Sequence, residues 1–532
     1  MVKDGKIWIA NTADGKEVSL LPRMANRHGL VAGATGTGKT VTLKVMAESF
    51  SEMGVPVFMA DVKGDIASLL MPGTDSEDMQ ARIEKFGLSE AGFSYQGYPV
   101  TLWDIFGKNG IQLRTTIAEI GPLLLGRILG LNDLQQSVLA VVYRIADENG
   151  LLLYDIKDLK AMLNHVSENT KTYEAEYGKM SPATLAVIIR SLVELESEGG
   201  DVFFGEPALN INDWLTLDPS GKGRINILDS ESLVNSGKLY STFLLWLLSE
   251  LFETLPEVGD LDKPKLVFFF DEAHLLFKDT SKQLLDKIEQ VVKLIRSKGV
   301  GIYFCTQNPR DIPDGVLSQL GNKIEHGLHA YTPADQKAVR AAAESFRVNE
   351  AFNTYETILS LGTGEAIASF LDEQGIPQVC EKVSILPPKS RFGAITEAER
   401  DNAIKSSLSY SKYAAATDPD SAYELLARMG LQAQAEAEKA KAEAEAAKLA
   451  EAEAKEAAKQ QKAAEKAAEK EAAKKEQARQ KAVKSTANAV LGTVGREAGK
   501  MVGKNFGSFG KTLGGNLGAS LGRGLLSTLF KN

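Results

Sequence analysis

Short apolar runs alternate with longer amphipathic stretches along the first 390 residues. His28–Ala34, Leu266–Phe270 and Val300–Gln307 are runs in which nearly every position is apolar. This pattern predicts strands that are buried on both faces. Val41–Met53 follows the first run with helical spacing, and Gly54 marks the expected end of that helix. Strands that alternate with helices predict an α/β fold with a mainly parallel sheet.

The middle of the chain, between Trp103 and Lys265, has a mostly helical pattern. The expected helices are Thr115–Leu129, Asp133–Asn149, Asp155–His165, Pro182–Glu198 and Leu239–Thr254. One strand, Arg224–Leu228, is expected among them. An insertion of about 150 residues is long enough to be a domain of its own, so we place a mostly helical subdomain at 105–262.

The strand and helix pattern resumes after Gln307 and ends near residue 391. The expected elements are the strand Lys323–Leu328, the helix Ala334–Glu344, the strand Glu365–Phe370 and a final edge strand near Gln378–Val383. The remaining divisions are a short N-terminal hairpin (1–27), a first core segment (28–104), a second core segment (263–391), a helical linker (392–430), an Ala/Glu/Lys-rich helix (431–485) and a Gly-rich basic tail (486–532). In the hairpin, Lys6–Ile9 and Val18–Leu21 would pair around a turn at Asp14-Gly15.

The chain changes character near residue 430. Residues 432–484 are almost only Ala, Glu, Lys and Gln, which predicts a solvated helix with charged pairs three and four residues apart. Its apolar residues are mainly alanine, so a single exposed helix and a coiled coil both stay open. In the basic tail, glycine recurs every four residues at Gly495, Gly499, Gly503 and Gly507, and again at Gly510, Gly514, Gly518 and Gly522. A helix with this stripe would contact a partner helix or a membrane surface, and a flexible tail is the alternative.

The distribution of charged residues along the 532-residue chain also changes near residue 430. The formal net charge is −9, but residues 431–532 carry 19 basic and 12 acidic residues, so an acidic body bears a basic tail. This balance excludes a wholly basic nucleic-acid coat but not a basic channel. Only two cysteines are present, which fits a reducing compartment. The apolar runs are far below the roughly 18 residues that span a bilayer. We therefore expect a cytoplasmic chain, with the tail as the region that would contact a membrane peripherally.

A glycine-rich motif joins the first expected strand to the first expected helix. Gly33-Ala34-Thr35-Gly36-Thr37-Gly38-Lys39-Thr40 matches the phosphate-binding loop pattern G-x-x-x-x-G-K-[ST]. Such a loop points backbone N–H groups at phosphate oxygens, at a helix N-terminus. Lys39 would reach the β and γ phosphates, and the Thr40 hydroxyl would bind Mg²⁺. The expected nucleotide-binding residues are Gly33, Ala34, Thr35, Gly36, Thr37, Gly38, Lys39, Thr40 and Val41, with ATP and Mg²⁺ as ligands.

Two acids end the second buried strand. Asp271 and Glu272 directly follow Leu266–Phe270, at the end of a strand where open α/β sheets bind ligands. Asp271 would hold Mg²⁺, and Glu272 would act as the general base on the attacking water.

Two further residues complete a motor-type site. Gln307 ends the third buried strand and would sense the γ-phosphate or position water. Arg296 lies eleven residues earlier, where an arginine can act as a finger in the nucleotide site of a neighbouring subunit. His326 and His329 flank Gly327-Leu328 but lack the further ligands that a metal site needs.

These motifs together resemble the HerA/FtsK class of P-loop ATPases. The resemblance rests on the phosphate-binding loop, Asp61-Val62-Lys63-Gly64-Asp65 after the next strand, the Asp271-Glu272 pair, and Arg296 with Gln307. Four more stretches are similar to the bacterial YjgR-like branch, whose members are described as HerA-like helicase proteins: Thr101–Asp104, Gly121–Leu125, Leu152–Leu159 and Phe203–Pro207. The similarity covers roughly Met1–Arg391.

The resemblance implies a RecA-like core, assembly into a ring that is often hexameric, and ATP-driven translocation on double-stranded DNA. HerA proteins begin with a β-barrel, whereas only about 25 residues precede the first core strand here, enough for one hairpin. The residues fit other motors as well. An ATP-driven motor or switch that acts on protein, or at the membrane through the C-terminal tail, stays open, as does a nucleotide-gated scaffold that hydrolyses slowly.

Overall fold

The structure is a computed structural model that describes residues 1–233, 236–277 and 282–482. The chain divides into two compact units. The first is formed by Met1–Thr170 and Tyr177–Ala422, and the second by Lys171–Glu176 and the residues from Tyr423 onward.

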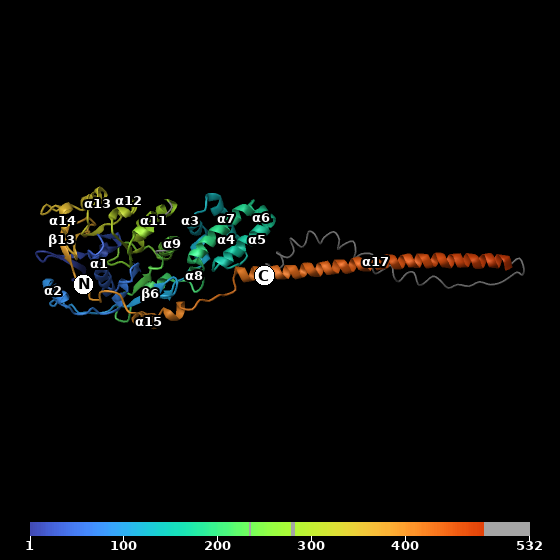
Figure 1. Cartoon of the computed structure of the whole chain (residues 1–532), viewed down its shortest axis with the longest axis horizontal. Coiled ribbons are helices and arrows are strands. Elements are labelled where there is room, and N and C mark those ends of the chain that lie inside the picture. The colour runs from blue at the N-terminus through green and yellow to red at the C-terminus, as the bar shows by residue number, and fades with distance from the viewer. Residues whose placement is uncertain (234–235, 278–281, 483–532) are drawn as a thin grey trace. The chain divides into compact units, whose positions relative to one another are not determined.

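One large sheet organises the first unit (Figure 1). Eight neighbouring strands run parallel, in the order β11-β4-β10-β9-β5-β8-β6-β7. Their bounds are β4 (Gly29–Ala32), β5 (Val57–Asp61), β6 (Val100–Asp104), β7 (Ile111–Gln112), β8 (Ile225–Asp229), β9 (Leu266–Phe270), β10 (Val300–Thr306) and β11 (Asn322–His326). Antiparallel strands extend the sheet beyond β11: β12 (Glu365–Ser369), β13 (Glu381–Ile385), β2 (Lys6–Thr12), β3 (Glu17–Leu20) and β1 (Val2–Lys3). The predicted α/β fold with a mainly parallel sheet is confirmed.

Helices cover both faces of the sheet, which explains why central strands such as β9 are apolar at every position. Met59 and Phe269 lie in the same buried cluster as Phe50 of helix α1. The alternate residues Phe58 and Phe268 are in ring contact on the other face, where Phe58 also contacts Phe243 of helix α9. Because side chains alternate across a strand, each face receives every second residue and needs its own apolar cover.

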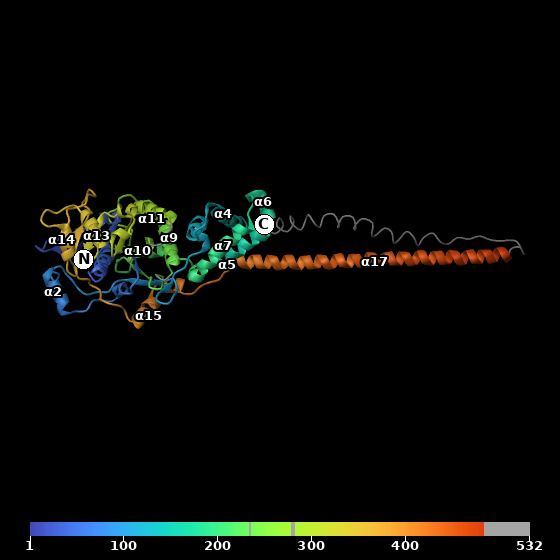
Figure 2. The same cartoon turned by 45° about the horizontal axis from the view of Figure 1, so that its top comes forward.

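The helices follow the strands along the chain. Their bounds are α1 (Lys39–Glu52), α2 (Glu77–Lys85), α3 (Ile117–Ile128), α4 (Asp133–Glu148), α5 (Ile156–Glu168), α6 (Thr170–Tyr177), α7 (Pro182–Leu195), α8 (Asp201–Phe203), α9 (Gly237–Thr254), α10 (His274–Phe277), α11 (Lys282–Ile295), α12 (Asp314–Leu317), α13 (Pro333–Glu344), α14 (Thr354–Ser360), α15 (Glu397–Ser406), α16 (Tyr410–Tyr413) and α17 (Ala422–Ala482). Helices α3, α4, α5 and α7 gather in one cluster, which is also visible in the turned view of Figure 2.

The helical stretch expected at 105–262 also contributes to the core. It supplies two strands of the parallel sheet: β8 lies between β5 and β6, and β7 pairs with β6. Helix α9 covers that sheet. The helix expected at Thr115–Leu129 is broken at Gly121, which has a φ of 69° and is followed by Pro122. Proline lacks the N–H that a continuous helix needs, so the chain turns there. The N-terminal hairpin pairs as expected. Its strand β2 also pairs with β13, so the strand expected at the edge near Gln378–Val383 has a neighbour on each side and is not an edge strand.

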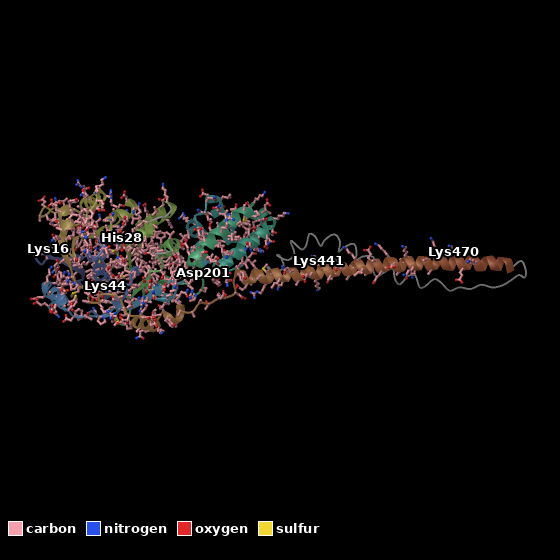
Figure 3. The ribbon with its side chains drawn as sticks, viewed as in Figure 1. Lys16, His28, Lys44, Asp201, Lys441 and Lys470 are labelled. Atoms are coloured by element: carbon pink, nitrogen blue, oxygen red, sulfur yellow. The ribbon has the colours of Figure 1, made fainter. Side chains whose placement is uncertain are left out.

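The second unit is dominated by α17, a single helix of 61 residues. Its side chains are exposed along most of its length, and Figure 3 labels Lys441 and Lys470 on it. Within the described residues, Leu431 and Leu449 are exposed rather than packed in a seam, so the coiled coil stays a prediction. The glycine stripe from Gly495 onward lies outside the described residues. Among the helices that are described, none combines the length and apolarity that crossing a membrane requires.

Candidate functional site

The predicted nucleotide-site residues meet at one edge of the sheet. Parallel strands place all their carboxyl ends on the same side. The phosphate-binding loop follows β4, Asp61 ends β5, Asp271 and Glu272 follow β9, and Gln307 follows β10. Residues that are more than 250 positions apart in the sequence are therefore neighbours in the site.

Glycine is required at two points where the phosphate-binding loop bends. Gly33 has a φ of 150° and Gly38 a φ of 114°, a region that other residues rarely adopt. A Cβ atom on Gly33 would lie 2.5 Å from the Cβ of His326, so a side chain also has no room there. The loop is fixed between two strands because Gly33 N donates to Thr306 O at 3.3 Å and Ala34 N donates to Gly327 O at 2.9 Å.

Lys39 lies inside this loop as the first residue of α1. Its Nζ donates to Gly33 O at 2.6 Å and to Ala34 O at 2.9 Å, and the side chain is buried. Thr37 Oγ1 donates to Ala34 O at 2.7 Å, which closes the loop further. The ammonium group is thus held by the backbone at the place where phosphate oxygens would come.

Asp271 presents a carboxylate oxygen that is suited to a cation. The residue is 3% exposed, and its Oδ2 has no hydrogen-bond partner among the described residues. Burial raises the pKa of Asp271, and the neighbouring charge of Glu272 raises it further. A buried oxygen left without a donor fits Mg²⁺, which prefers one or two carboxylates together with phosphate oxygens and water. The described residues contain no cluster of three or more His, Cys, Asp or Glu side chains that could hold a metal ion.

Glu272 is held by side-chain contacts with two other residues of the site, Lys63 and Gln307. Its Oε1 accepts from Lys63 Nζ at 2.7 Å, and Gln307 Nε2 donates to both of its oxygens at 3.1 and 3.3 Å. Burial raises the pKa of Glu272, but the ion pair with Lys63 and the hydrogen bond from Gln307 outweigh burial and hold the pKa below its usual value. Glu272 is therefore charged. It also has a φ of 47°, a strained conformation that directs its side chain into this network.

Gln307 links the Glu272 carboxylate to the phosphate-binding loop. While its Nε2 donates to Glu272, its Oε1 accepts from Thr35 Oγ1 at 3.3 Å. One amide therefore contacts both halves of the predicted site, and a ligand that moves Thr35 would also disturb Glu272.

Lys63 is held in place by the acidic turn that follows β5. Asp61 Oδ1 accepts from Lys63 N at 3.2 Å and Gly64 N at 2.8 Å, and its Oδ2 accepts from Ile66 N and Ala67 N. Burial raises the pKa of Asp61 to about 7, and the nearby Asp65 contributes to the rise. The sequence motif includes Lys63 but does not predict its contact with Glu272.

Arg296 is the one predicted site residue that the fold does not bring to this edge. It lies in a short helical turn just before β10, and its Nη2 is 3.8 Å from Oδ1 of Asp260. This is the edge where the parallel strands begin, opposite the phosphate-binding loop.

His326 packs against Gly33 of the phosphate-binding loop and contacts Thr42 of α1. The sequence pattern does not predict this role. Its Nδ1 lies 2.9 Å from Glu365 O, and its Nε2 lies 2.9 Å from Thr42 Oγ1. Because a carbonyl oxygen only accepts, Nδ1 carries the proton, and Nε2 accepts from the Thr42 hydroxyl. Burial lowers the pKa of His326 to about 4, so the ring is neutral. Strand β11 (Asn-Lys-Ile-Glu-His) is mostly polar, so the pattern that marks Asp271 and Gln307 does not mark His326.

The His326→Ala variant is expected to lower the free energy of unfolding by about 2–4 kcal/mol, since it leaves a cavity and takes away the buried partners of Thr42 and Glu365 O. Urea unfolding of the full chain measures the loss. His329→Ala is the matched control, because that ring is exposed and its removal should change the value by less than about 0.5 kcal/mol. Equal effects of the two substitutions would contradict the supporting role of His326.

Glu325, next to His326, is a second buried polar residue at this edge. It is 2% exposed, and its Oε1 has no hydrogen-bond partner among the described residues. Burial raises the pKa of Glu325 to about 8, although the charge of Lys39 acts to lower it. A carboxyl group with this pKa is mostly protonated at pH 7, so it leaves the positive charge of Lys39 available to phosphate.

Known proteins share both the sequence pattern and the fold. A family model described as Helicase HerA-like C-terminal matches residues 6–513. The chain is 23% identical over 369 residues to the DNA double-strand break repair helicase HerA of Sulfolobus acidocaldarius, over 69% of this chain and 66% of that protein. It is 24% identical over 362 residues to the protein of the same name from Sulfurisphaera tokodaii, over 66% of this chain and 64% of that protein. The chain thus spans just under two thirds of the length of these relatives.

Among solved structures, the bacterial conjugative coupling protein TrwB has the same fold. One structure, an unbound form, has a TM-score of 0.51 at 16% identity and covers 75% of this chain and 92% of that chain. Another, in complex with a non-hydrolysable GTP analogue, has a TM-score of 0.50 over the same shares. At this identity the similarity concerns the fold alone.

Proposed function

Because this chain belongs to the Helicase HerA-like C-terminal family, we propose that it is an ATPase that assembles into a ring and uses ATP hydrolysis to move along double-stranded DNA. The observation that carries the proposal is the convergence of Lys39, Asp271, Glu272 and Gln307 at one edge of the parallel sheet. A P-loop ATPase needs these four kinds of group together: a cation for phosphate, a metal ligand, a base, and a polar residue that connects them.

The phosphate-binding loop would receive the triphosphate at the N-terminus of α1. Its backbone N–H groups and the positive end of the helix dipole favour anions there. Lys39 would exchange its contacts with Gly33 O and Ala34 O for phosphate oxygens. The exchange is favourable because an ammonium group binds a charged oxygen more strongly than it binds a neutral carbonyl.

Thr40 and Asp271 would hold Mg²⁺ together with the phosphates. The bound ion would supply charge neutralisation for the β and γ phosphates. Asp271 meets this need with its unpartnered Oδ2, and Thr40 stands on the first turn of α1, next to Lys39.

Glu272 would take the proton from the attacking water. In this structure its Oε1 accepts from Lys63 and both of its oxygens accept from Gln307, so a water at Oε1 would compete with these contacts. Movement of Lys63 away from Oε1 would open that oxygen to the water. The side chain of Lys63 is 42% exposed and free to move, and the anionic γ-phosphate would attract it.

Arg296 would act in the nucleotide site of a neighbouring copy in the ring. Its position at the opposite edge of the sheet keeps it from its own site. Mixed assemblies test this assignment: chains with Arg296→Ala and chains with Glu272→Gln, each inactive alone, should regain some of the activity when combined, because some interfaces then carry both intact groups. Mixtures that regain no activity remove Arg296 from this role.

We propose the same domain boundaries that the sequence predicts, with one change. We assign residues 113–224 as the helical subdomain and include β7, β8 and α9 in the core, since all three pack into the central sheet.

Steady-state ATP hydrolysis by the full chain tests the proposed function. Turnover is expected to rise severalfold or more with double-stranded DNA, and the stimulation should fall between about 50 and 200 mM salt as phosphate contacts weaken. Glu272→Gln serves as the blank, and excess EDTA should abolish turnover. Hydrolysis that ignores DNA would overturn the DNA aspect of the proposal and favour a protein or membrane substrate reached through residues 486–532. Binding of ATP with negligible turnover would favour a nucleotide-gated scaffold.

A further inference from the structure

A cavity of about 290 Å³ lies beside the phosphate-binding loop and has no role in the proposed chemistry. It is lined by Gly38 of the loop, Val41 of α1, Arg82 of α2, Gly364 before β12, and Pro387 and Phe392 after β13. The lining also includes the apolar Met79 and Ile385, three Ser or Thr residues and the acidic residue Asp78, so apolar walls have a polar edge with one acid. Segments from four regions of the sequence thus form one hollow next to the predicted phosphate site.

One wall is fastened directly to the phosphate-binding loop. Gly364 N donates to Thr37 O at 2.9 Å, and Ile385 N donates to Gly364 O at 2.8 Å. A Cβ atom on Gly38 would lie 3.3 Å from Gly364, so the two backbones are in close contact. The hollow therefore keeps its position relative to Lys39 and Thr40.

A second wall is the segment 387–392, which is held on α1 by a buried carboxylate. Glu48 accepts from Lys389 N at 2.9 Å, and from Ser390 N at 3.0 Å and Ser390 Oγ at 2.6 Å. Lys44 Nζ donates to Arg391 O, which fixes the next residue. Such buried, charge-assisted contacts hold a segment firmly. They place Pro387 and Phe392 at the rim of the hollow.

Arg82 and Phe392 are the two side chains of the lining that present a flat surface. The guanidinium group of Arg82 lies against Gly364, where a Cβ atom would meet its Nη1 and Nη2 at 3.2 Å. No carboxylate of the described residues forms an ion pair with it. Phe392 is 50% exposed, so much of its ring is open to solvent. An unpaired guanidinium and an open aromatic ring are both partners for a planar ring that stacks.

We propose that this cavity receives the purine base of the bound nucleotide, and that Arg82 and Phe392 contact the base. The proposal rests on the proposed function, because it assumes that the triphosphate occupies the adjacent loop. The base follows the ribose away from the phosphates, past Val41, into a hollow whose apolar walls exclude water from its faces. Stacking on an aromatic ring changes affinity by roughly 10-fold in typical sites. Purines, with the larger ring system, would bind more tightly than pyrimidines.

Equilibrium binding of three probes to the full chain tests the proposal: ATP, CTP and inorganic tripolyphosphate, each with Mg²⁺, measured by calorimetry. Wild-type protein should bind ATP about tenfold more tightly than CTP or tripolyphosphate. Phe392→Ala and Arg82→Met should each weaken ATP binding about tenfold and leave tripolyphosphate binding within twofold. Leu408→Ala and Arg23→Met are matched controls, because both side chains are exposed and neither lines the cavity. Both controls should leave ATP binding unchanged.

The other outcomes separate the two proposals. Wild-type protein that binds ATP no more tightly than tripolyphosphate would overturn the base site while leaving the phosphate site in place. Variants whose affinities for ATP and tripolyphosphate fall equally would also overturn it, since Arg82 or Phe392 would then contribute to phosphate binding. Wild-type protein that binds none of the three probes would instead overturn the proposed function itself.

Discussion

Lys39→Ala is expected to weaken ATP binding at least about 100-fold and to reduce turnover to background. The buried ammonium group makes two backbone contacts in this structure and would make charged contacts to phosphate in the complex. Hydrogen bonds to charged groups contribute about 1.5–3 kcal/mol each, and each 1.4 kcal/mol corresponds to a factor of ten in affinity. Loss of two such contacts accounts for the expected size of the effect.

Ligand-induced stabilisation measures this loss without depending on activity. A saturating nucleotide at 100 times its Kd adds about 2.7 kcal/mol to the folded state, which appears as a rise in Tm. We expect that rise for wild type and for Lys16→Ala, whose side chain lies at the surface and pairs with Glu381. We expect none for Lys39→Ala. A normal ATP-dependent rise in Lys39→Ala would show that the phosphates bind elsewhere.

The phosphate-binding loop and the acid pair could be predicted from the sequence because their geometry is local. The strand, the glycines and the helix of the phosphate-binding loop are contiguous, and Gly33 and Gly38 have the backbone conformations that the motif requires. The same holds for Asp271 and Glu272, since the apolar strand before them ends at the edge where ligands bind. In each case the apolar strand ends at the same edge of the sheet, where these residues lie together.

The features that escaped prediction depend on strand order and on contacts between distant segments. A short strand within a helical stretch does not reveal that it inserts between β5 and β6, because its neighbours in the sheet lie far away in the sequence. Lys63 contacts Glu272 across 209 positions, and Thr42 contacts His326 across 284. No periodicity or motif encodes such pairs. They follow from the parallel sheet once its order is known.

Glu272→Gln is expected to retain nucleotide binding and to lower turnover about 10²- to 10⁴-fold. The substitution keeps the size of the side chain and an oxygen that can accept from Gln307, so the network around Thr35 can persist. It removes the negative charge, so the side chain can no longer take a proton from water, and a positioned base contributes about this factor. Because the phosphates contact other residues, Kd for ATP should stay within about threefold of wild type.

Pre-steady-state measurement of ATP cleavage, alongside ATP binding to the same preparation, distinguishes a chemical role for Glu272 from a structural one. Glu373→Gln is the matched control. Glu373 is an exposed acid in the loop after β12, at the edge where the parallel strands begin, opposite the phosphate-binding loop. Its variant should cleave ATP at the wild-type rate. Turnover of Glu272→Gln within threefold of wild type would remove Glu272 from the base role. Loss of binding together with cleavage would show instead that its contacts with Lys63 and Gln307 hold the site together, because those contacts are the ones that the charge strengthens.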